Sequence, residues 1–363
     1  MVSVTCGPMG PTERERGQPD LRRIGLHPDF WYPMARSRDL KINQPLSVAF
    51  AGDPIVLVRT ESGAVFALED RCAHRQMPLS LGVVQGERLK CCYHGWCYDR
   101  TGRCVSIPGF GPVEERPRGV RAYPAREAYG LVFVFPGDES KAGSVAFPEI
   151  PSFDHETHKT LTYAREVRCH YTFMHENLMD MSHQFLHRKL MGSIQATVLD
   201  RRSGTDWVEV DYRFERKAGK PMFGANFLTG KRPKGEDHPG YDIMTIRTHY
   251  PYQWLQVRRP NSDEPVMRLW AVYVPTDREQ RRCRSYGLLM VRRPRKQAWI
   301  LDVAAPVMRR FTESIFTEDR MAVEAEQRAY DQQGGDWNHE ISPVMLDLRA
   351  CLRRNGVPSG PQS

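Results

Sequence analysis

The 363-residue sequence has no run of about 18 apolar residues, the length at which a helix can cross a bilayer. Its first residues are rich in proline, glycine and charge and lack the apolar centre of a secretory signal peptide. We therefore expect a cytoplasmic protein that does not enter a membrane. Residues 1–27 are predicted to be a flexible tail, and residues 355–363 a second tail.

Cysteine is sparse. Nine residues in a chain of this length are too few for a disulfide framework, and an odd number argues further against one. Five of the nine nevertheless lie within 33 residues, together with two histidines. In a reducing compartment, such a cluster indicates metal binding. Its members are Cys72, His74, Cys91, Cys92, His94, Cys97 and Cys104.

The sequence also lacks a basic tract and a dinucleotide fingerprint. The net charge is +8, but lysine and arginine are scattered, so we expect a solvated basic surface and no nucleic-acid partner. Such a surface favours an acidic redox partner. The nearest approach to G-x-G-x-x-G is Gly109-Phe110-Gly111, which does not continue the pattern.

Two different patterns divide the remaining chain. From about residue 45 to 138, short β-prone runs alternate with turn sequences, which predicts a small antiparallel β unit. Residues 139–160 form a plausible boundary. Further alternating strands are expected at 206–215, 246–259, 267–276 and 284–293, followed by a helix from about 296 to 332. Residues 217–242, rich in glycine, proline and lysine, are predicted to be a long loop that forms a lid or is partly disordered.

A stretch between these regions, ENLMDMSHQFLH (176–187), predicts a metal-binding helix. Asp180, His183 and His187 fall at i, i+3 and i+7, so a helix places them on one face. Two histidines and a carboxylate form the facial triad of non-haem Fe(II) oxygenases. An ordinary helix with two histidines, or half of a zinc site, remains an alternative at this point.

Cys72-Ala-His74 and Cys91-Cys92-Tyr93-His94 form two Cys/His pairs. Zinc fingers pair Cys with Cys and His with His, so these two pairs do not match that pattern. A [2Fe–2S] cluster in which one iron takes two cysteines and the other two histidines does match.

These segments, CAHRQMPLSLG and CYHGWCYD, resemble the Rieske motif of the Rieske non-haem iron oxygenases. The resemblance implies that Cys72, His74, Cys91 and His94 are cluster ligands. Cys91 is preferred to Cys92 because the family spacing is C-x2-H. The implied fold is α+β: an N-terminal all-β Rieske [2Fe-2S] domain (28–145), followed by a catalytic mononuclear iron domain (146–354) with a helix-on-antiparallel-sheet, helix-grip or START-like architecture.

Within the same resemblance, ENLMDMSHQFLH is similar to the family's iron helix. His183 and His187 would be the two imidazole ligands, although three residues separate them where many members have four. Asn177 occupies the position of a family asparagine near the iron. A hydrogen bond across the core is an equally good interpretation of Asn177.

The resemblance changes the role of Asp180. In the family, this aspartate joins a histidine of a neighbouring cluster to a histidine at the iron, so it is not itself a ligand. The third ligand is expected from the helix downstream, in the pair Glu318-Asp319. We assign Asp319, with Glu318 as the second choice.

The resemblance implies a terminal oxygenase component that uses O2 to hydroxylate or oxidatively demethylate an aromatic or other apolar small molecule. It implies a separate NAD(P)H-dependent reductase, with or without a ferredoxin, and a head-to-tail homotrimer. The chain is most similar to the dicamba, vanillate and pheophorbide branch. Alternatives are a ring-dihydroxylating dioxygenase, a Rieske electron carrier and a zinc-stabilised binding module. Candidate pocket residues are Phe185, Met222, Phe223 and Phe227.

Overall fold

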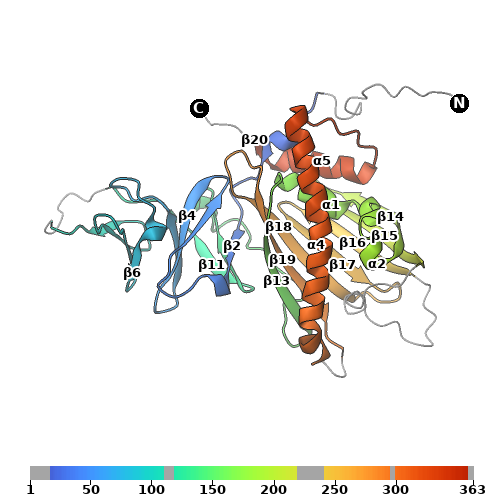
Figure 1. The fold of residues 1–363 in the computed structure, drawn as a ribbon, viewed down its shortest axis with the longest axis horizontal. Helices are drawn as coiled ribbons and strands as arrows, with labels where there is room; N and C mark the ends of the chain where they lie inside the picture. The colour runs from blue at the N-terminus through green and yellow to red at the C-terminus, as the bar shows by residue number, and fades with distance from the viewer. Residues whose placement is uncertain (1–16, 110–117, 219–240, 295–298, 359–363) are drawn as a thin grey trace.

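The computed structural model describes residues 17–109, 118–218, 241–294 and 299–358. A smaller unit built mainly of strands lies beside a larger unit in which helices cover one sheet (Figure 1). The expected α+β class, with the all-β part first, is therefore confirmed. In the described part of the chain, no helix is both long and apolar enough to span a membrane.

The N-terminal β unit contains three antiparallel sheets. At one hairpin, Ala51 and Gly52 both have positive φ (47° and 86°), as expected for the tight turn between adjacent strands. One sheet has the order β10-β5-β4-β3, the second β11-β12-β2 and the third β6-β7-β8-β9. The strands are β2 (Tyr32–Arg36), β3 (Leu46–Phe50), β4 (Asp53–Arg59), β5 (Val65–Glu69), β6 (Val83–Gln85), β7 (Arg88–Lys90), β8 (Cys97–Tyr98), β9 (Cys104–Ser106), β10 (Ala122–Tyr123), β11 (Ala125–Ala128) and β12 (Leu131–Val134).

The C-terminal unit is organised around one seven-stranded antiparallel sheet of order β13-β19-β18-β17-β16-β15-β14. Alternating burial along β17 shows why these segments form strands with one face toward the core. The strands are β13 (His158–Val167), β14 (Ser193–Ser203), β15 (Trp207–Ala218), β16 (Tyr241–His249), β17 (Tyr252–Arg258), β18 (Pro265–Pro275) and β19 (Cys283–Arg292).

Helices cover this sheet and carry the candidate metal ligands (Figure 1). The 34-residue α4 (Ile300–Gln333) packs along β13 and the neighbouring strands through Leu301, Ala304, Met308 and Phe311. The shorter elements are α1 (Tyr171–Met179), the 3-10 helix η5 (Met181–Phe185), α2 (Arg188–Met191) and α5 (Pro343–Asn355). The prediction of a helix after about residue 296 is confirmed.

The two units share one hydrophobic core, which includes Leu57 and Phe133 of the first and Trp270 of the second. Backbone and side-chain hydrogen bonds cross the junction, from Ala51 N to the Pro275 carbonyl and from the Tyr252 hydroxyl to the Trp31 carbonyl (2.8 Å each). The relative position of the units is therefore set by packing as well as by hydrogen bonds.

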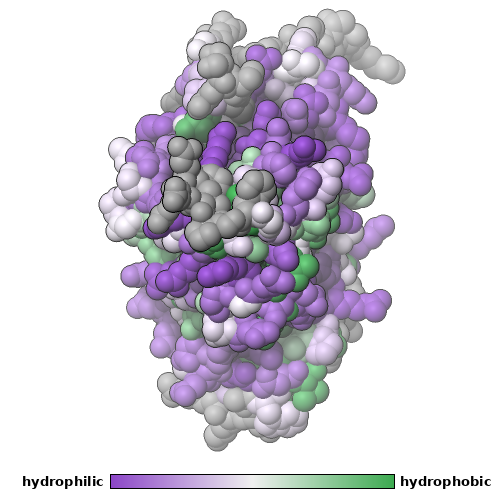
Figure 2. All heavy atoms as spheres, turned by 90° about the vertical axis from the view of Figure 1, so that its left-hand side faces the viewer, coloured by the Kyte–Doolittle hydropathy of each residue, from purple (hydrophilic) through white to green (hydrophobic). Residues whose placement is uncertain are grey.

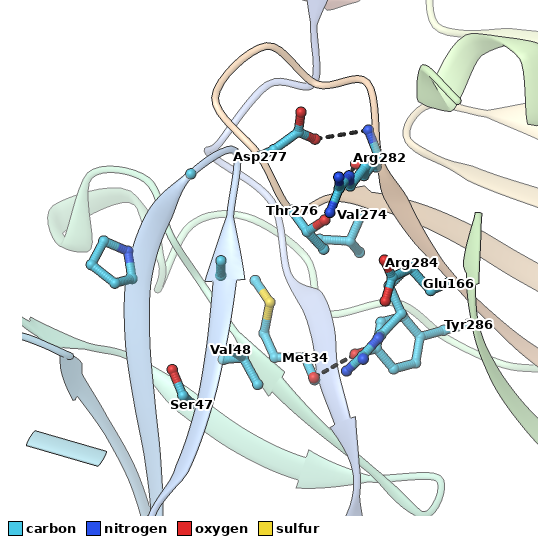
Figure 3. Close-up of a pocket in the computed structure, with 13 residues that line it drawn as sticks. Met34, Ser47, Val48, Glu166, Val274, Thr276, Asp277, Arg282, Arg284 and Tyr286 are labelled. Atoms are coloured by element: carbon cyan, nitrogen blue, oxygen red, sulfur yellow. Dashed lines mark hydrogen bonds between the residues drawn. The ribbon is translucent and has the colours of Figure 1, made fainter. Parts of the chain in front are cut away.

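A cavity of about 380 Å³ lies at this junction (Figure 3). Arg282 and Arg284 of the β19 side, with Glu166 and Asp277, supply its charged groups. The Asp277 carboxylate already accepts the backbone N–H of Arg282 at 2.7 Å. None of the predicted site residues lines this cavity.

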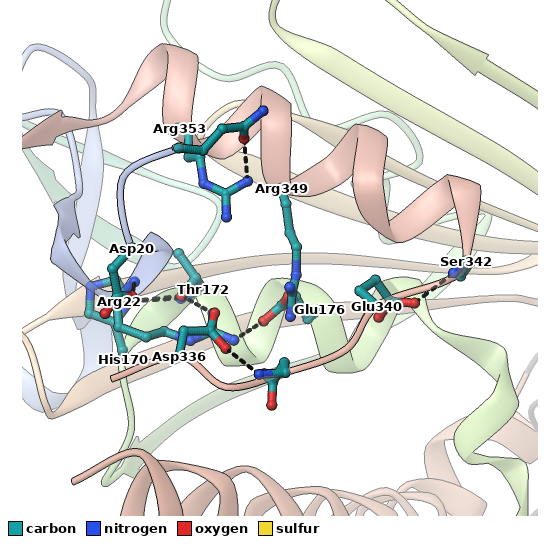
Figure 4. Close-up of polar contacts among 12 residues, drawn as sticks. Asp20, Arg22, His170, Thr172, Glu176, Asp336, Glu340, Ser342, Arg349 and Arg353 are labelled. Atoms are coloured by element: carbon teal, nitrogen blue, oxygen red, sulfur yellow. Dashed lines mark hydrogen bonds and ion pairs between the residues drawn. The ribbon is translucent and has the colours of Figure 1, made fainter. Parts of the chain in front are cut away.

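A buried ionic cluster joins α1 to Arg22, near the N-terminus, and to Arg349 of α5 (Figure 4). Glu176 of α1 accepts hydrogen bonds from Arg22 and Arg349, and the three side chains are 11%, 1% and 3% exposed. Next to Arg22, β1 (Ile24–Gly25) pairs with β20 (Val357–Pro358). These contacts correct the expectation of flexible tails for the described residues 20–27 and 355–358. The buried Arg22–Glu176 ion pair and the pairing of β1 with β20 hold these segments in place.

Two further expectations are corrected. The stretch 176–187 is not one helix, because Asp180 is extended (φ −88°, ψ 101°) and its carboxylate caps the following 3-10 helix by accepting the Ser182 N–H at 2.7 Å. Residues 246–259 are not one strand, since a turn at Tyr250-Pro251 separates β16 from β17. Most of the expected lid, 219–240, lies outside the described residues.

Candidate metal centres

Two loops of the N-terminal β unit bring the Cys/His pairs together. The first follows β5, where the Gln76 N–H closes a turn onto the Cys72 carbonyl at 2.8 Å. The second joins β7 to β8, where the Gly95 N–H reaches the Cys91 carbonyl at 3.2 Å. Gly95 has φ +73°, and a Cβ there would lie 2.7 Å from Pro108 Cγ, so this turn requires glycine.

The sulfur atoms of Cys72 and Cys91 are buried side by side, whereas Cys92 is exposed. The backbone N–H groups of Tyr93 and His94 are directed at the Cys91 sulfur, which favours a thiolate, although burial raises the pKa of this thiol overall. This geometry favours Cys91 over Cys92 as the partner of Cys72.

The imidazoles of His74 and His94 are exposed on the outer side of the same two loops. Their ring centroids are 4.5 Å apart, and Trp96 stacks on His74 at 4.9 Å. Two buried sulfurs behind two exposed imidazoles match the donor set of a [2Fe–2S] cluster in which two cysteines hold one iron and two histidines hold the other. The structure therefore pairs the two predicted cysteines with each other and the two predicted histidines with each other, on the same two loops.

The second centre lies between α4 and the segment that follows α1. Ligand atoms of His183, His187 and Asp319 all lie within 4.8 Å of one another. Asp319 Oδ1 is 3.1 Å from His187 Nε2 and 3.7 Å from His183 Nε2. Two histidines and one carboxylate from two elements converge on one point, as in a facial triad.

In His183 and His187, the hydrogen bond made by Nδ1 fixes the tautomer and leaves Nε2 free to bind a metal. His187 Nδ1 lies 2.8 Å from Glu318 Oε2, and His183 Nδ1 contacts the backbone carbonyl of Asp180. Since both partners are acceptors, each Nδ1 carries the proton and each Nε2 presents a lone pair. The two imidazoles and the Asp319 carboxylate therefore fit a divalent metal ion. Burial lowers the pKa of His187, but the neighbouring carboxylates of Asp319 and Glu318 outweigh this effect and raise it.

Two predicted neighbours of the triad take positions that differ in part from expectation. The Asn177 amide lies 3.5 Å from Asp319 Oδ1, at the edge of hydrogen-bonding distance, so this residue belongs to the surroundings of the triad. Asp180 reaches His183 through its backbone carbonyl, while its carboxylate caps η5. The expected carboxylate–histidine contact is therefore absent within this single described chain.

Sequence reasoning missed two residues that contact the predicted ligands. Glu318 was considered only as a substitute ligand, but it holds the far side of His187. Tyr98 places its hydroxyl 3.1 Å from Cys72 Sγ. No spacing rule connects Tyr98 with Cys72, whereas the adjacency of Glu318 to Asp319 is a signal that could have been used.

An apolar cavity of about 220 Å³ opens beside the triad. It is enclosed by α1, α4 and the face of the seven-stranded sheet, and methionine and leucine dominate its wall. Phe185 does not line it, because this side chain is 76% exposed, which corrects the expectation for that residue. Met222, Phe223 and Phe227 lie outside the described residues.

Comparison with protein-family models gives two matches. Residues 30–124 match the Rieske [2Fe-2S] domain, and residues 167–349 match the vanillate O-demethylase oxygenase C-terminal domain. The second match covers half of the chain. The first includes both Cys/His loops and the second includes His183, His187 and Asp319.

Individual proteins are similar over long segments. The 4beta-methylsterol monooxygenase of Methylococcus capsulatus is 28% identical over 341 residues, 91% of this chain and 88% of that protein. The oxygenase component of dicamba O-demethylase from Stenotrophomonas maltophilia is 33% identical over 172 residues, 47% of this chain and 50% of that protein.

Solved structures share the fold. The crystal structure of dicamba monooxygenase bound to dicamba superposes with a TM-score of 0.72 at 23% identity, covering 92% of this chain and 96% of that chain. NdmB of Pseudomonas putida CBB5 superposes with a TM-score of 0.68 at 20% identity and covers 92% of both chains.

Proposed function

The chain belongs to the Rieske non-haem iron oxygenases with a vanillate O-demethylase-type C-terminal domain, and from this premise we propose that it hydroxylates or oxidatively demethylates an apolar small molecule. It is a terminal oxygenase with a Rieske [2Fe–2S] site and a mononuclear iron site. The observation that carries the proposal is the position of His183, His187 and Asp319 in the wall of an apolar cavity.

In this proposal, Cys72, Cys91, His74 and His94 hold the cluster within a domain of residues 28–145. The catalytic domain spans residues 146–354. When bound, the two metal centres supply electron transfer and activation of O2.

The chain's own groups position the ligands and the substrate. Glu318 and the Asp180 carbonyl orient the two imidazoles, and Asn177 contacts the ligand carboxylate. The methionine- and leucine-rich wall binds the apolar body of the substrate and displaces water from the cavity.

Assembly is the second part of the proposal. The cluster loops and the triad lie in different halves of one chain (Figure 1), while His74 and His94 are exposed. We propose a head-to-tail homotrimer in which the exposed histidines of one chain approach Asp180 of the next. Replacing Asp180 by Asn is then expected to stop turnover while both metals remain. Normal turnover by this variant would refute the link through Asp180.

Electrons come from a separate reductase, either directly or through a ferredoxin. The end of the molecule formed by the N-terminal β unit is mostly hydrophilic (Figure 2), and Arg71, Arg75, Arg88 and Arg100 are exposed on this unit. A basic surface of this kind suits an acidic redox partner. We place the enzyme in the cytoplasm, where the described cysteines other than the cluster ligands Cys72 and Cys91 would remain free thiols.

Similarity supports the reaction type. The named relatives include a methylsterol monooxygenase and a dicamba O-demethylase. We therefore propose that the oxidised carbon is a methyl group, either on a ring or on oxygen or nitrogen.

The test is a product screen. The holoenzyme, loaded with iron and cluster, is supplied with a reductase, NADH and 18O2 and is offered methoxylated, N-methylated and ring-methylated aromatic compounds and methylsterols. The proposal predicts incorporation of 18O, or release of formaldehyde in proportion to NADH consumed. Asp319→Ala should abolish both. Absence of any oxygenated product across the panel, with both metal centres filled, would refute it.

A further inference from the structure

Three polar residues form a row across adjacent strands on the floor of the cavity. Arg165 of β13 pairs directly with Ser285 of β19, and Ser285 pairs directly with Tyr273 of β18. All three line the cavity. Directly opposed residues have Cβ atoms about 4.5–5.5 Å apart, so these side chains form one continuous strip.

The outer members of this row have partners, although Nη2 of Arg165 is buried without one among the described residues. Arg165 donates through Nε to Glu313 at 2.9 Å, and its guanidinium lies between the rings of Tyr163 and Phe316. The Tyr273 hydroxyl donates to the Gln253 side-chain carbonyl at 2.9 Å.

Other polar groups at the cavity are also engaged or inaccessible. Thr312 donates to the Met308 carbonyl at 2.9 Å, and the Gln184 side-chain oxygen accepts from Ala196 N at 3.0 Å. The Tyr163 hydroxyl oxygen has no partner among the described residues, but it is itself buried in the protein.

Ser285 is the neutral middle member of the row. The residue is 6% exposed, and its hydroxyl has no hydrogen-bond partner among the residues that the structure describes. A buried hydroxyl without a partner costs free energy unless a ligand supplies one.

The rest of the floor is mostly apolar. The next row along the strands places Gly287 between Tyr163 and Ala271, and the one beyond it places Leu289 against Leu269, which pairs with Leu255. Apart from Tyr163, the polar residues of the floor therefore lie at one end of the cavity.

That end is the one nearest the metal ligands. Phe316, which stacks on Arg165, precedes Asp319 on α4 by one turn. Tyr273 is also close enough to Asp319 for its pKa to be affected, since burial raises this pKa most and the Asp319 charge raises it further.

We propose that Ser285 hydrogen-bonds the one uncharged polar group of an otherwise apolar substrate and so selects which end of the substrate faces His183, His187 and Asp319. This inference rests on the proposed oxygenase function and deepens it: the oxidised carbon lies close to the substrate's own oxygen or nitrogen. Ser285 is a specificity-determining residue, because it contacts substrate without binding the metal.

An uncharged group is favoured on electrostatic grounds. The positive charge of Arg165 is matched by Glu313, and the carboxylates of Glu318 and Asp319 lie at the same end of the cavity. A carboxylate on the substrate would add negative charge there, and the charge of the lining cation Arg165 is already matched by Glu313.

The test uses three probes of nearly equal shape: 2-acetylnaphthalene, 2-ethylnaphthalene and 2-naphthoate. Dissociation constants are measured calorimetrically with the iron-loaded holoenzyme, without O2 or reductant. Ser285→Ala removes only the hydroxyl, and Ser285→Thr keeps a hydroxyl on a residue suited to a strand. We expect Ser285→Ala to weaken binding of the ketone about threefold to tenfold, the worth of one neutral hydrogen bond, and Ser285→Thr to stay within about twofold of wild type.

The ethyl probe is the matched control, and its affinity should change less than about twofold in Ser285→Ala. Equal loss for ketone and ethyl probes, no loss for either, or no measurable binding of the ketone to wild type would overturn the inference. So would a loss for 2-naphthoate as large as that for the ketone. Because binding is measured without turnover, an enzyme that binds as expected but forms no product in the screen above refutes the oxygenase proposal alone.

Discussion

The buried cluster of Arg22, Glu176 and Arg349 permits a quantitative prediction for the folding of the catalytic unit. Glu176→Ala removes the carboxylate that two buried guanidinium groups share, and these two side chains are only 1% and 3% exposed. Breaking a buried ion pair in this way costs about 3–5 kcal/mol. Glu176→Gln keeps an acceptor oxygen and should lose less, about 1.5–3 kcal/mol, the worth of a hydrogen bond to a charged group.

The assay is urea unfolding followed by fluorescence, with the midpoint compared at constant slope. Glu264→Ala is the matched control, because the Glu264–Arg292 pair has a carboxylate side chain that is 68% exposed and should contribute less than about 1 kcal/mol. A loss of under about 1 kcal/mol for Glu176→Ala would refute the idea that this cluster fastens α1 to both ends of the chain.

The same cluster predicts a pH dependence. Burial alone raises the pKa of Glu176, but the charges of Arg22 and Arg349 outweigh it and hold the pKa below the usual 4.5. A carboxyl whose folded pKa is depressed contributes stability that is fully present above 4.5 and is lost as the pH falls through the folded value. Wild type should therefore lose stability on acidification below about pH 4.5 more steeply than Glu176→Gln. Equal slopes would contradict this assignment.

Three further changes test the sites. Cys91→Ala should abolish the visible cluster spectrum while Cys92→Ala keeps it, and the reverse result would show that the choice between them is wrong. Glu318→Ala should weaken iron binding about 10–100-fold without altering the cluster spectrum. Glu318→Gln should retain more of the affinity for iron. Unchanged iron binding in Glu318→Ala would show that Glu318 does not position His187. Gly287→Ala should narrow the cavity without a clash, because a Cβ there lies 3.6 Å from Leu269 Cδ1. Unfolding midpoints should therefore stay unchanged while the affinity for 2-ethylnaphthalene falls; unchanged affinity would place the substrate elsewhere.

The metal sites could be predicted mainly from short sequence motifs. The two Cys/His pairs and the His183/His187 spacing depend on chemistry that needs fixed residue types at fixed intervals, and the structure places each set together. Asp319 could be found only through family resemblance, since it lies more than a hundred residues from the histidines and nothing local distinguishes it from other acids on α4.

Other features depend on competition between local and tertiary interactions. A helical period over 176–187 was a sound expectation, but the Asp180 carboxylate binds the Ser182 N–H and ends α1 at that point. The N-terminal segment looked like a tail because its composition is polar, yet Arg22 is buried against a carboxylate 154 positions away. Neither partner is visible from a local window of sequence.

The sequence also does not show which polar residues line the cavity. Ser285 is one of several serines, and its position follows only from the strand register that sets it between Arg165 and Tyr273. Phe185, which looked like a pocket residue, faces outward because the helix breaks before it.

The most direct test of the central claim, that one chain carries two separate iron centres, is iron and acid-labile sulfide analysis of wild type and Asp319→Ala, with EPR of the reduced cluster. The structure predicts about three iron atoms and two sulfides per wild-type chain, and about two of each in Asp319→Ala with an unchanged cluster signal. Retention of the third iron in Asp319→Ala, or a wild-type protein with only the cluster iron after anaerobic loading with Fe(II), would contradict the account.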